Sequence, residues 1–169
     1  LWLAAGLVLA LLPLALLGAC AAGQDGVLPR VAAAALSAVI AALVSGVVVV
    51  GSAIADNQRA AAPFGTVHAF DARSGEVKWT FDPIPRDASD ARASTWGEGR
   101  RTTGHANVWA PMSVDEARSL VFMPTSSPSP DFFGGLRPGD NRHANSVVAI
   151  EAATGAVRWV YQIVHHDVW

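Results

Sequence analysis

An internal repeat constrains the fold of this chain more than any other feature of its sequence. Residues 69–79 and 149–159 share the pattern Ala-x-acidic-Ala-x-Ser/Thr-Gly-x-Val-basic-Trp. A repeat of this kind indicates one structural unit that occurs more than once and packs against its own copies. The polar part of the chain is therefore expected to contain two related units.

Each copy of the repeat predicts a β-hairpin. Apolar residues alternate with more polar ones before the turn, which favours a strand. Asp71 in the first copy and Glu151 in the second lead into Ser/Thr-Gly, and the glycine supplies the positive φ of a tight turn. The returning strand ends in Trp79 or Trp159, whose ring can lie flat between neighbouring sheets. A repeated hairpin with a terminal Trp is typical of a β-propeller blade.

Two long loops separate the copies. Segments 108–114 and 119–124 are predicted strands, whereas segments 83–104 and 126–145 are rich in Pro, Gly and polar residues and indicate surface excursions. Loops of that length are uncommon unless they are functional or disordered. The sequence therefore predicts a site that is built from loops.

The first third of the chain has a different character. The 169 residues carry a net charge of −2, yet residues 1–55 contain only Asp25 and Arg30 as charged side chains. Residues 1–24 are uncharged, which indicates a secretory signal or a short membrane helix. The run Leu-Gly-Ala-Cys that ends at Cys20 resembles the lipobox of bacterial lipoproteins, in which the cysteine is lipidated. The alternative is that Cys20 simply ends a membrane helix.

A second uncharged stretch covers residues 31–55 and is long enough to span a bilayer. Its Ala-rich first part favours a helix to about Val44, and the β-branched residues 47–50 favour a buried strand, with Gly46 as a breaker between them. A membrane span and a helix followed by a strand stay open as alternatives. We expect an apolar leader over residues 1–45, with one or two transmembrane or signal helices, and a propeller part over residues 46–169.

Charge and cysteine content exclude two classes of protein. The near balance of acidic and basic residues argues against nucleic-acid binding, which needs clustered positive charge. A single cysteine excludes a disulfide scaffold.

Four stretches together resemble one family, the dehydrogenases that use pyrroloquinoline quinone (PQQ). The repeat resembles the family's tryptophan-docking motif, and residues 47–57 resemble the strand before such a hairpin. Residues 134–141, which contain Arg-Pro-Gly-Asp-Asn, resemble a loop of the alcohol-oxidising members. Residues 161–169, which end in His-His-Asp-Val-Trp, resemble the stretch before the catalytic aspartate of the membrane-bound glucose and quinate type. The resemblance implies an all-β fold, about two blades of an eight-bladed β-propeller.

The resemblance also implies site residues. Trp109 matches the tryptophan that forms the floor under PQQ, and Asn107 lies where the family has a polar cofactor contact. Ser127 falls where the alcohol-oxidising members have an asparagine bound to calcium, so the implied cofactors are PQQ and a divalent cation, calcium or magnesium. The family's catalytic base would follow Trp169 directly. We therefore assign no catalytic residue here and expect the chain alone to be inactive.

As to function, the resemblance implies the oxidation of an alcohol or sugar hydroxyl. The electrons would pass to membrane ubiquinone or to a cytochrome, at the bacterial inner membrane with the propeller part facing the periplasm. The alternative is a non-catalytic PQQ-like propeller lipoprotein that acts as an outer-membrane assembly scaffold. Residues 107–109, 137–141 and 165–169 favour the enzyme, because a scaffold has no need of all three.

Overall fold

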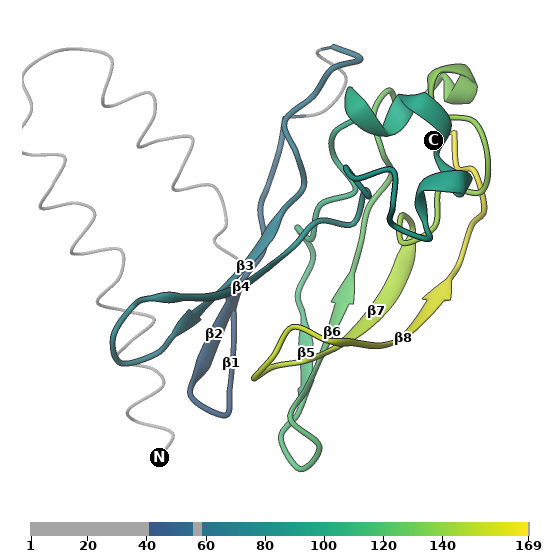
Figure 1. The fold of residues 1–169 in the computed structure, drawn as a ribbon. Coiled ribbons are helices and arrows are strands. Elements are labelled where there is room, and N and C mark those ends of the chain that lie inside the picture. The colour runs from purple at the N-terminus through teal and green to yellow at the C-terminus, as the bar shows by residue number, and fades with distance from the viewer. Residues whose placement is uncertain (1–40, 56–58, 169) are drawn as a thin grey trace, which may run out of the picture. The chain divides into compact units, whose positions relative to one another are not determined.

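Two antiparallel sheets form the body of the protein. The computed structural model describes residues 41–55 and 59–168. Each sheet is a four-stranded meander, in the order β1-β2-β3-β4 and β5-β6-β7-β8 (Figure 1). The strands are β1 Ala41–Val44, β2 Val47–Val50, β3 Val67–Asp71, β4 Val77–Phe81, β5 Ser113–Asp115, β6 Leu120–Pro124, β7 Ser146–Glu151 and β8 Val157–Gln162. This architecture confirms the all-β prediction, with one four-stranded unit for each repeat.

The two copies of the repeat form equivalent hairpins, β3–β4 and β7–β8. Gly75 and Gly155 both have φ of +75°, as the predicted tight turns require. The amide of Asp71 donates to Glu76 O at 2.8 Å, and the amide of Glu151 donates to Ala156 O at 2.9 Å. The pairing register also shifts at the equivalent place in both hairpins, directly after Ala69 in the first and directly after Ala149 in the second. The hairpin prediction is therefore confirmed in detail.

Trp79 joins one sheet to the other, as its place at the end of the repeat predicts. Its Nε1 donates to the carbonyl oxygen of Ala152 at 2.8 Å, in the turn of the second hairpin. Its ring lies directly against Gly155, where an added Cβ would approach Trp79 Cγ to 2.7 Å. The first repeat therefore docks on the turn of the second.

The main core lies between the two sheets. Val49 and Val67 of the first sheet and Val121, Val148 and Ile150 of the second are fully buried in one cluster. Burial of each such side chain stabilises the fold by about 1.5–3 kcal/mol relative to exposure. The strand patterns alternate because one face of each sheet supplies this core.

Two predicted elements are wrong. Residues 41–44 form β1, not the end of a helix, and pair with β2 through a turn at Ser45 and Gly46. Both turn residues have positive φ, 51° and 75°, which is the geometry of a two-residue hairpin; strand pairing thus overrides the helix propensity of alanine. The strand expected over 108–114 is also shorter and later, because β5 begins at Ser113.

The predictions for residues 1–40, including Cys20 and the leader helices, lie outside the described residues. Within residues 41–55 and 59–168, no helix has the length and apolar character needed to cross a membrane.

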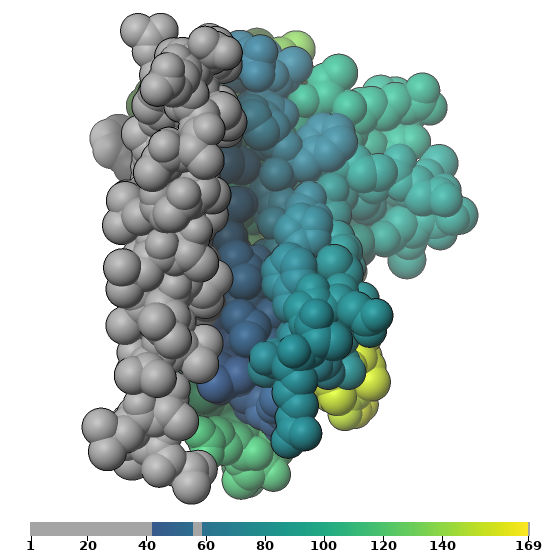
Figure 2. Space-filling view, turned by 90° about the vertical axis from the view of Figure 1, so that its left-hand side faces the viewer, coloured from purple at the N-terminus to yellow at the C-terminus, as the bar shows by residue number. Residues whose placement is uncertain are grey.

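The connections divide between the two ends of the sheets. Tight turns join β1 to β2, β3 to β4, β5 to β6 and β7 to β8 at one end, while the long segments gather at the other (Figure 1). These long segments carry the 3-10 helices η1 Ala93–Thr95, η2 Gly97–Arg101 and η3 Gly134–Leu136. The segment with η1 and η2 protrudes from the sheets at the upper right of Figure 2. It is nevertheless anchored by its own small core, in which Ile84, Trp96, Ala106 and Ala144 are buried.

Candidate functional site

Segments from both sheets meet at the end that carries the long loops. Their backbones bond directly to one another: Ser52 N donates to Val108 O at 3.0 Å, Ser126 N donates to Asn107 O at 3.0 Å, and Asn145 N donates to Ser126 O at 3.2 Å. Functional residues often lie on loops that a rigid scaffold positions. The loop end is therefore the candidate site.

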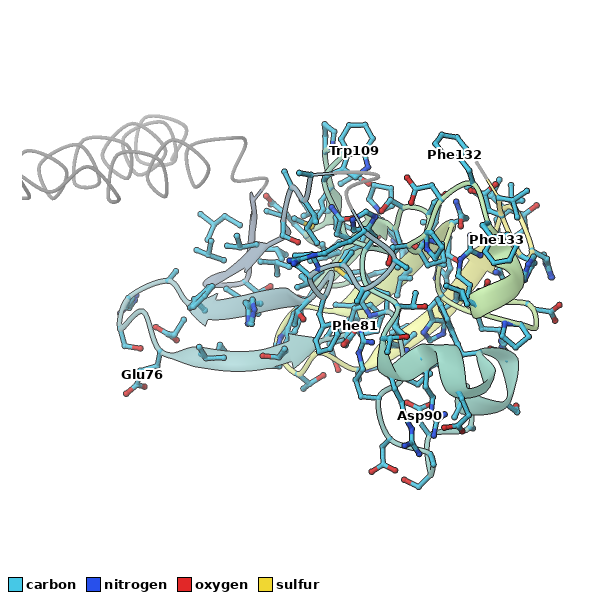
Figure 3. The ribbon with its side chains drawn as sticks, turned by 90° about the horizontal axis from the view of Figure 1, so that it is seen from above. Glu76, Phe81, Asp90, Trp109, Phe132 and Phe133 are labelled. Atoms are coloured by element: carbon cyan, nitrogen blue, oxygen red, sulfur yellow. The ribbon has the colours of Figure 1, made fainter. Side chains whose placement is uncertain are left out.

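Trp109 is exposed although its neighbours are buried. Val108 is fully buried in the main core and Asn107 is 3% exposed, whereas Trp109 is 57% exposed. Figure 3 shows the indole projecting away from the sheets at the edge of the loop end. The buried Asn107 and Val108 hold the backbone at Trp109 in place, while its side chain stays exposed. An exposed indole offers a flat face on which a planar molecule can stack.

Asn107 ties two loops together. Its Nδ2 donates to Ser52 O at 2.6 Å, and its Oδ1 accepts a hydrogen bond from Ser126 Oγ at 2.9 Å. An amide carries two N–H groups and two oxygen lone pairs, so each end of the side chain keeps one hydrogen-bonding position. Asn107 therefore fixes the backbone before Trp109 and retains part of its polar capacity.

Ser127 forms a cluster with Asn145 and Asp167. Ser127 Oγ donates a short hydrogen bond to Asp167 Oδ2. Asn145 Nδ2 donates to Ser127 Oγ at 3.0 Å and to Asp167 Oδ2 at 2.9 Å. Ser127 lies near the start of the loop between β6 and β7, Asn145 lies at the end of that loop, and Asp167 follows β8. The structure thus brings together one hydroxyl, one amide and one carboxylate, and Ser127 is the only one that sequence reasoning had singled out as a metal ligand.

Arg137 supports this cluster from inside the protein. The side chain is fully buried, and its Nη1 donates to Asn141 Oδ1 at 2.7 Å. Its Nη2 donates to Pro130 O and to the backbone oxygen of Asp167. Burial lowers the pKa of Arg137, while the charge of Asp167 acts in the opposite direction. The Arg-Pro-Gly-Asp-Asn stretch, expected mainly as a turn, therefore also holds the segment that carries Asp167.

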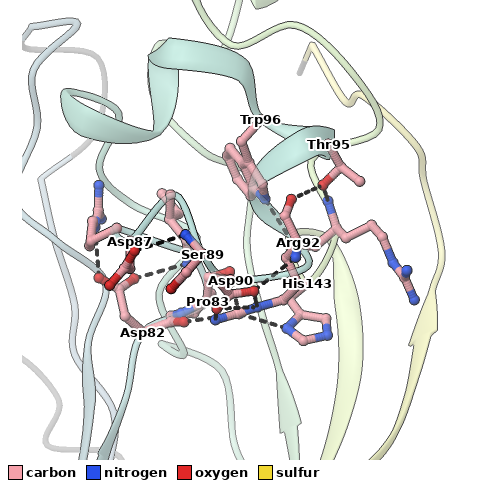
Figure 4. A network of polar contacts seen from close by, with 12 residues as sticks. Asp82, Pro83, Asp87, Ser89, Asp90, Arg92, Thr95, Trp96 and His143 are labelled. Atoms are coloured by element: carbon pink, nitrogen blue, oxygen red, sulfur yellow. Dashed lines mark hydrogen bonds and ion pairs between the residues drawn. The ribbon is translucent and has the colours of Figure 1, made fainter.

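A second polar network anchors the loop that ends at Asn145. Arg92 Nη1 donates to His143 Nδ1 at 2.8 Å and to the backbone oxygens of Asp82 and Pro83 at 3.2 and 3.1 Å (Figure 4). Arg92 Nη2 pairs with Asp90 Oδ2 at 2.7 Å. One guanidinium thus ties the protruding segment to the loop before β7.

His143 is neutral in this network. Burial, followed by the charges of Arg92 and Arg142, lowers the pKa of His143 to about 4. The backbone here is also unusual, since Asn141, His143 and Asn145 have φ of 51°, 77° and 47°. Asn and His tolerate the left-handed region better than most residues. Left-handed residues that recur in one loop are typical of functional sites, where the surrounding structure enforces the strain.

Sequence reasoning missed two members of the cluster. Asp167 lies inside the His-His-Asp-Val-Trp stretch but was not assigned a role of its own. Asn145 gave a weaker signal, a lone Asn directly before a strand, and its left-handed backbone and its bonds appear only in the fold. The double His contributes differently: His166 Nδ1 bonds Gly139 O at 2.7 Å and so anchors the same loop.

The cluster suits an oxygen-loving cation better than a transition metal. Within the part of the chain that the structure describes, no three His, Cys, Asp or Glu side chains gather in a way that could hold a metal. Hydroxyl, amide and carboxylate oxygens are ligands of calcium and magnesium. Asn145 now directs its N–H group at Ser127 and Asp167, so a cation here requires its amide to turn and present the carbonyl oxygen instead. The residues present fit such an ion after that single rotation.

Comparisons with known proteins identify the family of this chain. Residues 24–169 match the PQQ family described as glucose/ethanol/alcohol dehydrogenase, beta-propeller domain. The glycerol dehydrogenase large subunit of Gluconobacter oxydans (strain 621H) is 40% identical over 129 residues, which are 75% of this chain and 17% of that protein. The quinate/shikimate dehydrogenase (quinone) of Acinetobacter baylyi is 41% identical over 123 residues, which are 72% of this chain and 15% of that protein.

A solved structure shows the same relationship in three dimensions. Quinohemoprotein alcohol dehydrogenase ADHIIG from Pseudomonas putida HK5 matches with a TM-score of 0.65 and 27% identity, over 76% of this chain and 20% of that one. The chain thus spans less than a fifth of the length of the curated relatives named above. Because the family match covers most of its residues, the chain belongs to the PQQ (quinoprotein) dehydrogenase family and forms part of its β-propeller domain.

Proposed function

We propose that this chain supplies part of the cofactor site of a quinoprotein dehydrogenase that oxidises an alcohol or sugar hydroxyl. The observation that carries the proposal is the exposed indole of Trp109, which follows a buried Asn107 whose backbone oxygen bonds Ser126, next to Ser127 of the oxygen-rich cluster. A planar quinone needs a flat surface and oriented polar groups, and both lie at the loop end.

Trp109 forms the floor on which the ring system of PQQ stacks. Stacking favours a rigid platform, and Val108 and Asn107 provide one because both are buried and bonded to other loops. Asn107 offers the cofactor the N–H and the lone pair that Ser52 and Ser126 leave unused.

Ser127, Asn145 and Asp167 hold a divalent cation, calcium or magnesium. Asp167 supplies the negative charge, and the two neutral side chains supply oxygen ligands. A cation there neutralises a half-buried carboxylate that now depends on two hydrogen bonds. The chain's own contribution is therefore to position the cofactor and the ion and to keep their surroundings ordered.

Bound PQQ would supply a two-electron acceptor for the hydride on the carbon that bears the hydroxyl group, and with loss of the hydroxyl proton the substrate would be released as a carbonyl compound. We propose that the two electrons then pass to membrane ubiquinone or to a cytochrome. The uncharged residues 1–24 support a membrane location, and Arg30, in the short connection after them, favours the propeller part on the outer face.

A titration of the purified protein with PQQ and Ca²⁺, followed by tryptophan fluorescence, tests this function. Trp109→Ala is expected to weaken PQQ binding about tenfold, because stacking on an indole is worth on the order of 1 kcal/mol beyond its buried area. Trp159→Ala is the matched control, since Trp159 is also exposed, at 45%, but lies on β8 outside the loop end. Equal affinities in the two variants, or no binding by the unaltered protein, would contradict the proposal and leave the scaffold alternative.

A further inference from the structure

The second sheet has an apolar face that stays exposed. Phe122 of β6, Ala149 of β7 and Trp159 of β8 are paired across the strands, so they lie on one face of the sheet. Val148, the neighbour of Ala149, points into the main core on the other face. On the open face, Trp159 is 45% exposed and Tyr161 is 67% exposed. Large apolar side chains that gather on a surface indicate an interaction site.

The equivalent face of the first sheet is already occupied. The repeat aligns Trp79 with Trp159, and Trp79 lies on the face of the first sheet that packs against the second. Its Nε1 donates to Ala152 O at 2.8 Å, and its ring lies against Gly155. The interface within the chain thus joins a tryptophan of one repeat to the hairpin turn of the next.

The first hairpin presents the other half of the same interface. Ala72 and Gly75 are the equivalents of Ala152 and Gly155 in the repeat. Ala72 is exposed, whereas Ala152 is fully buried. Gly75 has the φ of +75° that Gly155 has, and a Cβ added at Gly75 would meet no atom within 4 Å. The first turn therefore has the backbone of a docking turn, and within residues 41–55 and 59–168 no indole lies against it.

The two turns are also held in the same way. Ala72 N donates to Gly46 O, and Ala152 N donates to Ser119 O, both at 2.9 Å. Each bond ties the hairpin turn to the neighbouring turn of its own sheet. A receiving site that is already ordered lowers the entropic cost of docking a partner there.

The surface next to the first turn is apolar as well. Val48 and Phe70 are paired and lie on the face opposite to the core-facing Val49. Both are partly exposed, and the strand registers align them with Val121 and Ile150 of the second sheet. Those two residues are fully buried against the first sheet. The first sheet therefore offers the same kind of surface that the second sheet already presents to Trp79.

We propose that copies of this chain associate head to tail, with Trp159 of one copy docked on the first hairpin of the next, where its Nε1 donates to the carbonyl oxygen of Ala72. The contact continues the interface that joins the two sheets within one chain. The two surfaces differ, so each added copy leaves one of each kind free, and association continues until a ring closes. The proposal concerns a second copy of this chain and does not depend on the proposed cofactor site.

Sedimentation of the full chain in a mild detergent, over a range of protein concentrations, measures this association. The unaltered protein should form dimers and larger species as its concentration rises. Trp159→Ala should raise the dissociation constant about tenfold or more, because a tryptophan in an interface often carries much of the binding energy. Trp109→Ala removes another exposed indole, at the loop end, and as the matched control should change the constant less than about twofold.

A second variant blocks the receiving turn. Asparagine tolerates a positive φ, so Gly75→Asn should keep the hairpin folded. Its side chain fills the space that an indole needs, since an added Cβ at the equivalent Gly155 would lie 2.7 Å from Trp79 Cγ. Gly75→Asn should therefore weaken association as much as Trp159→Ala does. The urea unfolding transition of each variant checks that it is folded.

A mixture of the two variants identifies the contact. Trp159→Ala keeps the receiving turn and Gly75→Asn keeps the indole, so the mixture should form a dimer with one copy of each and nothing larger. A full chain that stays monomeric at every concentration would overturn the proposal. Association that neither substitution weakens, as contacts through residues 1–24 would produce, would overturn it too, and so would a mixture that forms no dimer.

Discussion

The turn end and the loop end of the two sheets are built on different principles. At the turn end, both repeats use the same short hairpin, with glycine at the same φ and the same bulge. At the loop end, equivalent connections differ in length and sequence, and left-handed residues, buried polar side chains and an exposed indole occur close together. The regular hairpins of the turn end stabilise the pair of sheets, and the loop end contains the candidate functional residues. Substitutions at the two ends should therefore affect different properties.

The largest expected effect is on stability, from Trp79→Ala at the turn end. This change removes the indole that lies against the second hairpin and its hydrogen bond to Ala152 O. We expect a loss of about 3 kcal/mol in the free energy of unfolding, measured by urea titration. Trp159→Ala removes the same side chain from an exposed position and should cost well under half as much. Equal losses would show that docking between the sheets contributes little.

Glycine substitutions separate backbone strain from crowding at the same turns. Gly75→Ala meets no atom within 4 Å, so only the positive φ opposes it, at about 1 kcal/mol. Gly155→Ala has the same φ but places a Cβ 2.7 Å from Trp79 Cγ, and should cost about 2–3 kcal/mol. The two unfolding curves measured side by side check this difference. If both variants lose the same free energy, Trp79 does not press on this turn.

At the loop end, His143 should make stability depend on pH. Its pKa of about 4 in the folded protein lies below the ordinary value of 6.5, so the unfolded chain binds the proton more readily between these values. The contribution is complete above pH 6.5 and is lost as pH falls toward 4, by roughly 3 kcal/mol. Three charged groups act on His143: Arg92 and Arg142 oppose its protonation, and Asp90 favours it.

Unfolding measured from pH 4 to pH 7 tests this dependence against a variant. His143→Asn keeps an acceptor for Arg92 and a residue that tolerates the backbone φ of 77°, but removes the titrating group. The variant should lose the slope of stability between pH 4 and 6.5. A variant with the slope of the unaltered protein would place its origin elsewhere.

Asn145→Asp is expected to change stability by about 1 kcal/mol and reports on the cation site. A second carboxylate beside Asp167 repels it and so lowers the melting temperature in the absence of a divalent ion. Added Ca²⁺ should reverse the loss and stabilise this variant more than the unaltered protein, because a ligand that binds only the folded state raises its stability. Ca²⁺ that leaves both melting temperatures unchanged would argue against a cation at this cluster.

The same division between the two ends explains what the sequence could predict. The hairpins, their glycines and the docking of Trp79 follow from a local pattern that occurs twice, and the structure confirms them. The prediction of a helix over β1 was wrong because the alanines there favour a helix locally. Pairing with β2 through the Ser45–Gly46 turn makes the segment a strand instead.

The site was predictable only in part. Trp109, Asn107 and Ser127 came from a family resemblance, and the structure places all three at the loop end. Asn145 joins Ser127 across 18 residues, and Asp167 joins it across 40, and no local pattern encodes such contacts. The left-handed backbone of Asn145 belongs to a loop that the Arg92–His143 hydrogen bond ties to the protruding segment. Long-range contacts of this kind emerge from the assembled fold.

A crystal structure of the protein with PQQ and Ca²⁺ tests the central claim most directly. The ring system of PQQ should lie on the exposed face of Trp109. The ion should contact oxygens of Ser127, Asn145 and Asp167, with the Asn145 amide turned relative to its present hydrogen bonds. PQQ bound away from Trp109, or an ion with no ligand from this cluster, would contradict the assignment of the loop end as the cofactor site.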